Sequence, residues 1–384
     1  MNGQSPANKL ADIVYDPFVA QEQAENLPVF GVGVLTVHYQ AAITDGNDMY
    51  MMVKTGSYVS CNPPGAWATM DAACGPNTWN TQIWNEARFT WVNGVLMQIW
   101  IWPSDWKPEP TGSAIGSWEP VFHAADANGF IYVPGAGGTI WKLKKTDGSS
   151  ASHINAFSGV AGVVAANTFV AGPLTADSNG NIYYNVIQLA DPSQGDPYGQ
   201  NDIVNAWLVK VTPGDSPSIL TFASLLPNAP PASSQNCPGT FFNLNDNGAS
   251  LPWPPTVNAV PPPQACGSQR PGINIAPAVG PDGTIFTASR AHFDSLVSYV
   301  VAVEPDFSGP KWAASLQSLL NDGCGVLLLI AAPNVTNEPD SCRNGATQGI
   351  DPTTNGPGSG FISDLASWGT PLGMSHQRMR EIGL

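Results

Sequence analysis

Charged residues are scarce in this sequence, and basic residues are the scarcest. Charged side chains make up 11% of the 384 residues, less than half of the roughly 25% that is usual in globular proteins. Lys and Arg number 14 against 29 Asp and Glu, so the net charge is −15. Nucleic acids and anionic membranes both select basic surfaces, and the composition therefore argues against both as partners.

Long hydrophobic runs and a secretory leader are also lacking. The longest apolar run, near Val326–Ala332, has only the length of a strand, so we predict no membrane-spanning segment. Residues 1–10 do not show the charged-then-apolar layout of a signal peptide. If the protein is exported, we expect this chain to be a form without its leader.

Motifs of common enzyme classes are missing as well. The chain has no GxSxG, no HExxH, no P-loop, and no GxGxxG between a strand and a helix. Its carboxylates are scattered, and their spacing nominates no pair for glycoside hydrolysis. The sequence therefore names no catalytic residue, and we predict no metal site.

The six cysteines contain no CxxC pair, which argues against a zinc ribbon or a thioredoxin-type site. Pairing neighbours along the chain would close three loops rich in Gly, Pro and Asn, although other connectivities and free buried thiols are alternatives. Disulfides and low charge together favour an extracellular or periplasmic protein. The candidate pairs are Cys61–Cys74, Cys237–Cys266 and Cys324–Cys342.

Four stretches share a tight turn followed by an aromatic residue. An Asp-Gly or Asn-Gly pair between apolar residues favours a hairpin, because these residues tolerate positive φ. The stretches are 45–50, 126–132, 177–183 and 282–286. We interpret their aspartates as turn caps rather than calcium ligands, since each turn offers one or two oxygens and calcium loops concentrate several.

Each hairpin begins a longer unit of strands separated by turns. Further strands are expected at 88–91, 95–102, 139–143, 206–211 and 299–304. Four antiparallel strands per unit make a propeller blade. The predicted fold class is therefore an all-β propeller of four-stranded antiparallel blades. No further hairpin follows near the C-terminus, so we expect the propeller to be irregular or incomplete there.

One unit carries a family resemblance. Residues 125–132 read Ala-Asp-x-x-Gly-x-Ile-Tyr, and residues 138–143 read Gly-Thr-Ile-Trp-Lys-Leu, followed by Asp147-Gly148. This pattern resembles the PQQ-like β-propeller repeat of quinoprotein alcohol dehydrogenases and their non-enzymatic relatives. The resemblance covers roughly residues 40–320 and implies a propeller, while the repeat itself encodes blade packing and not a ligand. The vicinal cysteines and the Glu/Asn/Asp calcium set of the dehydrogenases have no match here. We therefore predict no cofactor, with PQQ or calcium as the alternative.

We divide the chain into an N-terminal segment, 1–28, and a single propeller domain, 29–384. Residues 227–266 hold ten prolines without strand periodicity and are predicted to form an ordered insertion clipped by a disulfide. An incomplete propeller leaves an unpaired strand edge, so an edge-strand partner is a further expectation.

Histidines near the hairpins are the first candidates for a binding site. His38 and His123 precede the first two turns, and His292 follows the fourth beside Arg290. Imidazoles that converge on a propeller channel can bind a ligand or act as general bases. The alternative is that each is a hydrogen-bonded residue in a partly buried strand.

Tryptophan is concentrated between residues 79 and 118, which hold seven of the 13. Trp100 and Trp102 alternate with two isoleucines, which predicts a strand buried on both sides and indole rings packed between blades. Trp79, Trp84 and Trp106 are expected in loops, where indole rings can contact a ligand such as a sugar.

These observations favour a non-catalytic role. The leading hypothesis is an exported binding or surface-interaction module, with a small molecule, a glycan or a protein bound at one face of the propeller. The alternative is a channel-centred enzyme, either a hydrolase or lyase or a quinone-dependent oxidoreductase.

Overall fold

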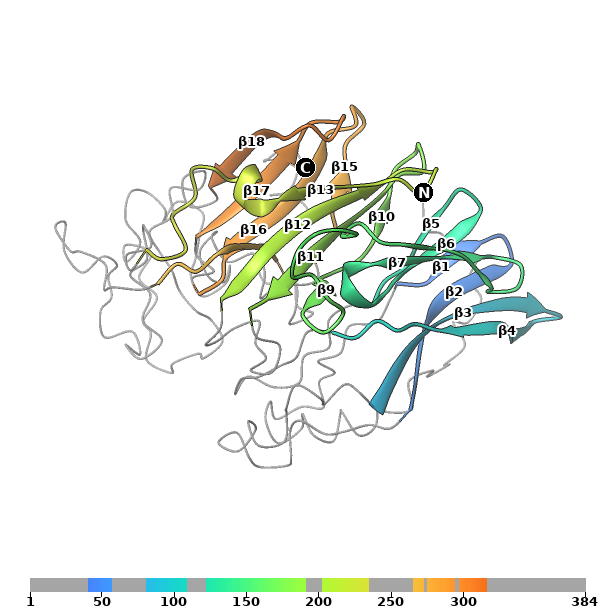
Figure 1. Cartoon of the computed structure of the whole chain (residues 1–384). Coiled ribbons are helices and arrows are strands. Elements are labelled where there is room, and N and C mark those ends of the chain that lie inside the picture. Colours follow the sequence, from blue (N-terminus) through green and yellow to red (C-terminus); the bar gives the residue numbers. More distant parts are fainter. Residues whose placement is uncertain are drawn as a thin grey trace, which may run out of the picture.

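The computed structural model describes residues 41–56, 81–108, 122–190, 202–234, 265–272, 275–293 and 297–315. Their strands form four antiparallel sheets, which we number 1 to 4 along the chain. The sheets lie side by side in chain order, from blue for sheet 1 to orange for sheet 4 (Figure 1). The predicted N-terminal segment and the C-terminal end of the predicted propeller lie outside the described residues.

Sheets 1 and 2 each contain four strands in sequence order. Sheet 1 consists of β1 (Ile43–Asp45), β2 (Asp48–Gly56), β3 (Gln82–Val92) and β4 (Val95–Pro103). Sheet 2 consists of β5 (Ala125–Ala127), β6 (Phe130–Pro134), β7 (Ile140–Lys144) and β8 (Ser150–Ile154), with the short 3₁₀ helix η3 (Ala136–Gly138) between β6 and β7. Two-residue turns join β1 to β2 and β5 to β6.

Sheets 3 and 4 follow the same order, but their first strand is split in two. In sheet 3, β9 (Thr168–Val170) and β10 (Thr175–Ala176) both pair with β11 (Ile182–Leu189), followed by β12 (Ile203–Val211) and β13 (Pro217–Thr221). Helix α3 (Phe222–Leu225) comes next. In sheet 4, β14 (Gln269–Pro271) and β15 (Ala278–Val279) both pair with β16 (Ile285–Ala291), followed by β17 (Ser298–Val303) and β18 (Pro310–Ser315).

The two breaks connect neighbouring sheets. At the break in sheet 3, the Leu174 amide donates a hydrogen bond of 3.2 Å to the carbonyl of His123, which precedes sheet 2. At the break in sheet 4, the Ile275 carbonyl accepts a hydrogen bond of 3.0 Å from Asn185 Nδ2 on β11. A backbone group at each break is thus satisfied by a residue of, or just before, the preceding sheet.

The repeated turns have the backbone geometry that their residues favour. Asn128 and Gly129 both have positive φ, 53° and 79°, as a tight two-residue hairpin requires. Gly46, Gly180 and Gly283 also have positive φ. The predicted all-β fold with propeller blades of four antiparallel strands is confirmed.

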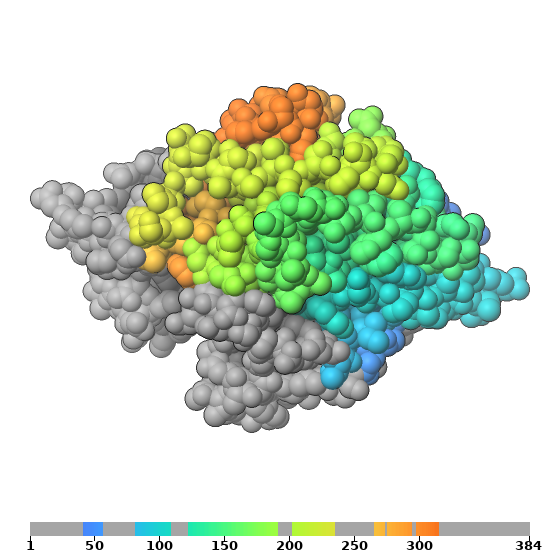
Figure 2. All heavy atoms as spheres, viewed as in Figure 1, coloured from blue at the N-terminus to red at the C-terminus, as the bar shows by residue number. Residues whose placement is uncertain are grey.

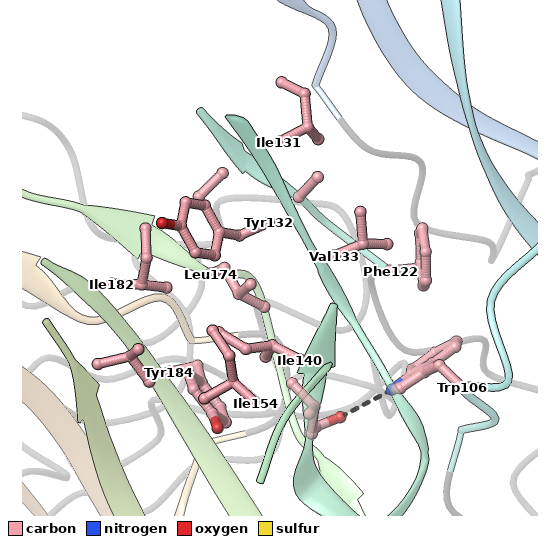
Figure 3. Close-up of a cluster of buried hydrophobic side chains, with 14 of the residues drawn as sticks. Trp106, Phe122, Ile131, Tyr132, Val133, Ile140, Ile154, Leu174, Ile182 and Tyr184 are labelled. Carbon is pink, nitrogen blue, oxygen red and sulfur yellow. Dashed lines mark hydrogen bonds between the residues drawn. The ribbon is translucent and has the colours of Figure 1, made fainter. Parts of the chain in front are cut away.

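Buried side chains fill the space between sheets. One cluster joins sheets 1, 2 and 3 and includes Trp84, Trp100, Tyr132, Tyr184 and Trp207. Figure 3 shows part of it, with Trp106 and Phe122 near β6 and β7 of sheet 2. A second cluster joins sheets 3 and 4. The prediction that indole rings pack between blades is confirmed for Trp100, which is buried in the first cluster, and for Trp102, which packs against it.

The turns also meet across sheets. Lys145 Nζ, just after β7, lies 2.8 Å from Asp45 of the first turn and 2.6 Å from Asp126 of the second. Asn128 Nδ2 donates a hydrogen bond of 2.8 Å to the carbonyl of Gly180 in the third turn. The recurring turn therefore reverses the chain and also contacts the next sheet.

Strand β4 differs from the prediction that it is buried on both sides. Trp100 is 8% exposed and packs toward sheet 2, but Ile99 and Ile101 are 45% and 40% exposed. The prediction was wrong because the described residues that pack on β4 cover Trp100 and leave most of the strand exposed.

Candidate functional site

Connections at the two ends of the strands differ in length, and this difference defines a loop face. Tight turns lie at one end, at 46–47, 93–94, 128–129 and 145–149. Much longer connections leave the other end, at 104–124, 155–167 and 222–268, beside one short connection at 135–139. Binding residues concentrate on long loops that a rigid scaffold holds in place, so a binding site is expected on the loop face.

A cavity of about 290 Å³ lies on this face, between β12 and α3 of sheet 3 and β14 of sheet 4. Its apolar wall is formed mainly by Val204, Ala206, Leu226, Pro227, Pro230 and Pro231. Its polar lining consists of Asn205, Thr221, Ser268 and Gln269. In Figure 2, the yellow atoms of the segment after β13 lie beside the light-orange start of sheet 4. None of the residues that line the cavity is charged.

Local capping interactions explain how the wall is built. Thr221 caps α3 by accepting a hydrogen bond of 3.0 Å from the Ser224 amide. Phe222 and Leu225 on α3 are fully buried, which anchors the proline-containing segment that follows. That segment is then closed at its base, because the Cys266 amide donates to the Ser234 carbonyl at 3.0 Å.

Hydrogen bonds also fix the polar lining. Asp202 accepts bonds from the Ser268 amide and hydroxyl, at 2.8 and 2.9 Å. Asn205 Nδ2 donates to Gln188 Oε1 at 2.9 Å. Gln269 Oε1 accepts from the Ser289 hydroxyl at 2.7 Å, while Gln269 Nε2 is buried and has no partner. A buried amide without a partner costs roughly 1–3 kcal/mol, so a hydrogen bond to this nitrogen would stabilise the folded chain.

His123 lies apart from this cavity, just before β5. Its ring is partly buried, and Nδ1 lies 2.8 Å from the Ala124 carbonyl oxygen. Burial lowers the pKa of His123, and the hydrogen bond to Ala124 opposes this effect only in part. The residue matches the alternative stated above, a hydrogen-bonded histidine in a partly buried position.

Arg290 and His292 lie at the end of β16, on the face of sheet 4 opposite to Ser289. Both side chains are buried, at 3% and 1% exposed, and the His292 ring meets Phe293 edge-on at 4.8 Å. Arg290 pairs across the strands with Arg270, which is also buried. The structure does not bring Arg290 and His292 together with His123, and neither residue lines the cavity.

Trp84 and Trp106 were expected in ligand-contacting loops, and this placement needs correction. Trp84 lies in β3 and is fully buried, and Trp106 is 1% exposed. Their rings meet edge to face at 5.3 Å, and Trp106 Nε1 donates to the Val170 carbonyl of sheet 3 (Figure 3). Both belong to the core because the segment after β4 turns inward over sheet 2.

Several predicted residues lie outside the described residues. These are His38, Trp79, Cys61, Cys74, Cys237, Cys324 and Cys342. Cys266 is described and fully buried, and the described part of the chain contains no free cysteine. The three cysteine pairs remain predictions.

The turn aspartates act in two ways. Asp177 and Asp282 cap their own turns, as predicted, by accepting hydrogen bonds from the Asn179 and Thr284 amides at 2.9 and 3.0 Å. Asp45 and Asp126 instead share the ammonium group of Lys145. Within the described ranges, no group of three or more His, Cys, Asp or Glu residues is placed to hold a metal ion.

Sequence reasoning missed Asn205 and Gln269, the amides of the cavity. Both belong to ordinary strand sequences, and neither lies in a motif. The one local signal was the proline-rich stretch after residue 226, which marked a long connection but not the strand that it would face.

Comparisons with known proteins were limited to remote structural likeness. No family model and no curated protein matches the chain. Among solved structures, it is similar to a europium-containing methanol dehydrogenase, with 10% identity, a TM-score of 0.38, and coverage of 73% of this chain and 42% of that one. It is also similar to the quinohemoprotein alcohol dehydrogenase from Comamonas testosteroni, with 12% identity, a TM-score of 0.36, and coverage of 73% and 35%.

A third similar structure is a protein of unknown function from Dyadobacter fermentans, with 9% identity, a TM-score of 0.35, and coverage of 73% of this chain and 69% of that one. The chain spans less than half the length of the two dehydrogenases. At these identities and TM-scores, the matches carry no argument about activity and favour neither a binding module nor an enzyme. Among the described residues, no helix has the length and apolar character needed to cross a membrane.

Proposed function

We propose that the chain is a binding module for a small uncharged molecule that carries several hydroxyl groups, as a sugar does. The ligand would occupy the cavity between β12, α3 and β14. The observation that carries the proposal is Gln269, which lines this cavity and whose buried Nε2 has no hydrogen-bond partner among the described residues. The uncharged lining supports a neutral ligand, because a charged one would lose its hydration without gaining a counter-charge.

The cavity offers both kinds of contact that a sugar needs. Gln269 supplies a donor, while the Asn205 amide is oriented by Gln188 and the Thr221 hydroxyl by Ser224. The proline, valine and leucine residues of the lining provide apolar surface for C–H groups. The cavity volume lies near the lower end of the range of ligand pockets, which favours one or two sugar rings over a longer chain.

Calorimetric titration with a panel of monosaccharides and disaccharides tests this proposal. The wild type should bind at least one of them, and Gln269→Leu should weaken that binding about tenfold, since one lost hydrogen bond is worth about 1–1.5 kcal/mol. Asn228→Leu is the matched control, because this amide is exposed near the cavity but does not line it. Equal affinity of the Gln269 variant, or no binding by the wild type, would contradict the proposal.

Export and three disulfides belong to the same proposal. They are supported by the low charge, the absence of CxxC pairs and the absence of a free cysteine among the described residues.

A further inference from the structure

Exposed apolar side chains gather on one hairpin, far along the chain from the cavity. Of the ten large hydrophobic residues that are strongly exposed in the described part of the chain, seven lie on β3 and β4. Their exposure ranges from 37% to 60%. In Figure 1, the β3–β4 hairpin projects at the right of the fan of sheets. The seven residues are Ile83, Trp91, Val92, Val95, Met97, Ile99 and Ile101.

The tip of the hairpin and strand β4 carry no charged residue, whereas β3 contains Glu86 and Arg88. From Phe89 to Ser104 the sequence contains no charged residue, and the flanking Arg88 is paired with Asp48 at 2.9 Å. Copies of a chain with a net charge of −15 repel each other in general. This hairpin is a surface where two copies can approach without placing like charges against each other.

Strand β4 is also an edge strand. It pairs with β3, and sheet 1 ends with it among the described residues. Natural edge strands are usually protected by lysine or other charges, by proline or by bulges. Among the described residues, the protection is limited to Pro103 at the end of β4 and one bulge opposite Arg88 and Phe89. From Val95 to Gln98 the register with β3 is regular, and no strand in the described part of the chain pairs with the outer edge.

We propose that β4 of one copy pairs antiparallel with β4 of a second copy across a two-fold axis. Two identical strands related by such an axis run antiparallel, so the strand is complementary to itself. The pairing would satisfy edge backbone groups and shield the apolar side chains that flank the new strand pair. Val95 and Met97 lie on one face of sheet 1, beyond the bulge from Ile101 on the other face. This inference does not depend on the proposed ligand, because β4 lies in sheet 1 and the cavity between sheets 3 and 4.

The oligomeric state of the full chain, measured by sedimentation velocity over micromolar concentrations, tests the dimer. The wild type should be a dimer, and Met97→Lys should weaken association at least about a hundredfold, because the axis brings two ammonium groups together. Ile101→Lys should act in the same direction. Val164→Lys is the control, because Val164 is 53% exposed but lies far from β4 in the chain, and it should remain a dimer.

Circular dichroism verifies that each variant is folded before its mass is interpreted. A wild type that is monomeric at every concentration would overturn the proposal, as would a folded Met97→Lys variant that remains dimeric. A monomer that instead co-sediments with neutral phosphatidylcholine vesicles would assign the hairpin to a lipid surface and also overturn it.

Discussion

Asp177 illustrates how a single residue holds a turn of this fold. Its carboxylate accepts hydrogen bonds from the amides of Asn179 and Asn181, from Asn181 Nδ2 and from the Tyr183 hydroxyl. Burial disfavours the charged form, but the bonds from Asn181, Tyr183 and Asn179 outweigh burial and lower the pKa of Asp177. Ionisation of this group therefore stabilises the folded chain.

The sign of the pH effect follows from the lowered pKa. A carboxyl with a lower pKa in the folded state stabilises the protein fully above its unfolded pKa of about 3.9, and this stabilisation is lost as the pH falls through the folded value. Asp177→Asn should lower the unfolding free energy by about 1–2 kcal/mol near neutral pH. The difference from the wild type should shrink below about pH 4.

Urea denaturation at neutral and acidic pH measures this effect. Tyr183→Phe removes one of the four bonds and should show a smaller effect with the same pH dependence. A constant difference between Asp177→Asn and the wild type across the pH range would show that the carboxylate charge is not responsible.

Residue patterns predicted the turns well and the cavity poorly, for a physical reason. Asn128-Gly129 encodes its turn locally, because Asn and Gly both tolerate the positive φ that the turn requires. Gln269 and Asn205 carry no comparable local signal. They line a cavity only because segments far apart in the sequence, near 205, 227 and 269, meet on the loop face.

At the scale of elements, the second and third repeated turns, in sheets 2 and 3, are in close contact. Gly180 has a φ of 78°, and a Cβ there would lie 2.0 Å from Asn128 Oδ1 of the adjacent turn. The Asn128 side chain could move away, but it would lose its hydrogen bond to the Gly180 carbonyl. Glycine at 180 is therefore required by both the backbone and the neighbouring sheet.

Two alanine substitutions separate these requirements. Gly129 also has positive φ, but nothing lies within 4 Å of the position of its Cβ. Gly129→Ala should cost about 1–2 kcal/mol from backbone strain alone, and Gly180→Ala about 1 kcal/mol more from the lost bond. Equal losses in urea denaturation would show that the contact between the turns contributes nothing.

The elements themselves were largely predictable, with one instructive exception. Strands 206–211 and 299–304 were anticipated within a few residues, as 203–211 and 298–303, because apolar runs bounded by turn residues favour strands. The exposure of β4 was not predicted, because an apolar sequence predicts a buried strand whether or not another part of the fold covers that strand. The position of a strand at a sheet edge is a property of the assembled fold.

At the scale of the whole molecule, the proline-rich insertion has two parts. Residues 227–232 contribute to the cavity wall. The hydrogen bonds from Cys266 to Ser234 and from Gly267 to Ala232 then close the base of the insertion. The boundary that matters for the fold is therefore near 234, later than the predicted start at 227.

Two deletions test this division. Replacing 235–264 with a short Gly-Ser linker should leave the melting temperature within a few degrees of the wild type and preserve ligand binding, because the bonded base remains. Deleting 227–263 should abolish binding, because the cavity wall is lost. Both deletions remove Cys237, so its loss cannot account for a difference between them. Loss of the cooperative thermal transition in the shorter deletion would show that 235–264 completes the core.

The split first strands have a kinetic consequence. The Leu174 amide is hydrogen-bonded to the carbonyl of His123 and not to its own sheet, so its exchange with solvent deuterium requires sheets 2 and 3 to move apart. Amides within β11 exchange only when sheet 3 itself opens. If the Leu174 amide exchanges faster than the β11 amides, sheets 2 and 3 separate while sheet 3 is still folded. If the two exchange rates are equal, the sheets separate only when sheet 3 unfolds.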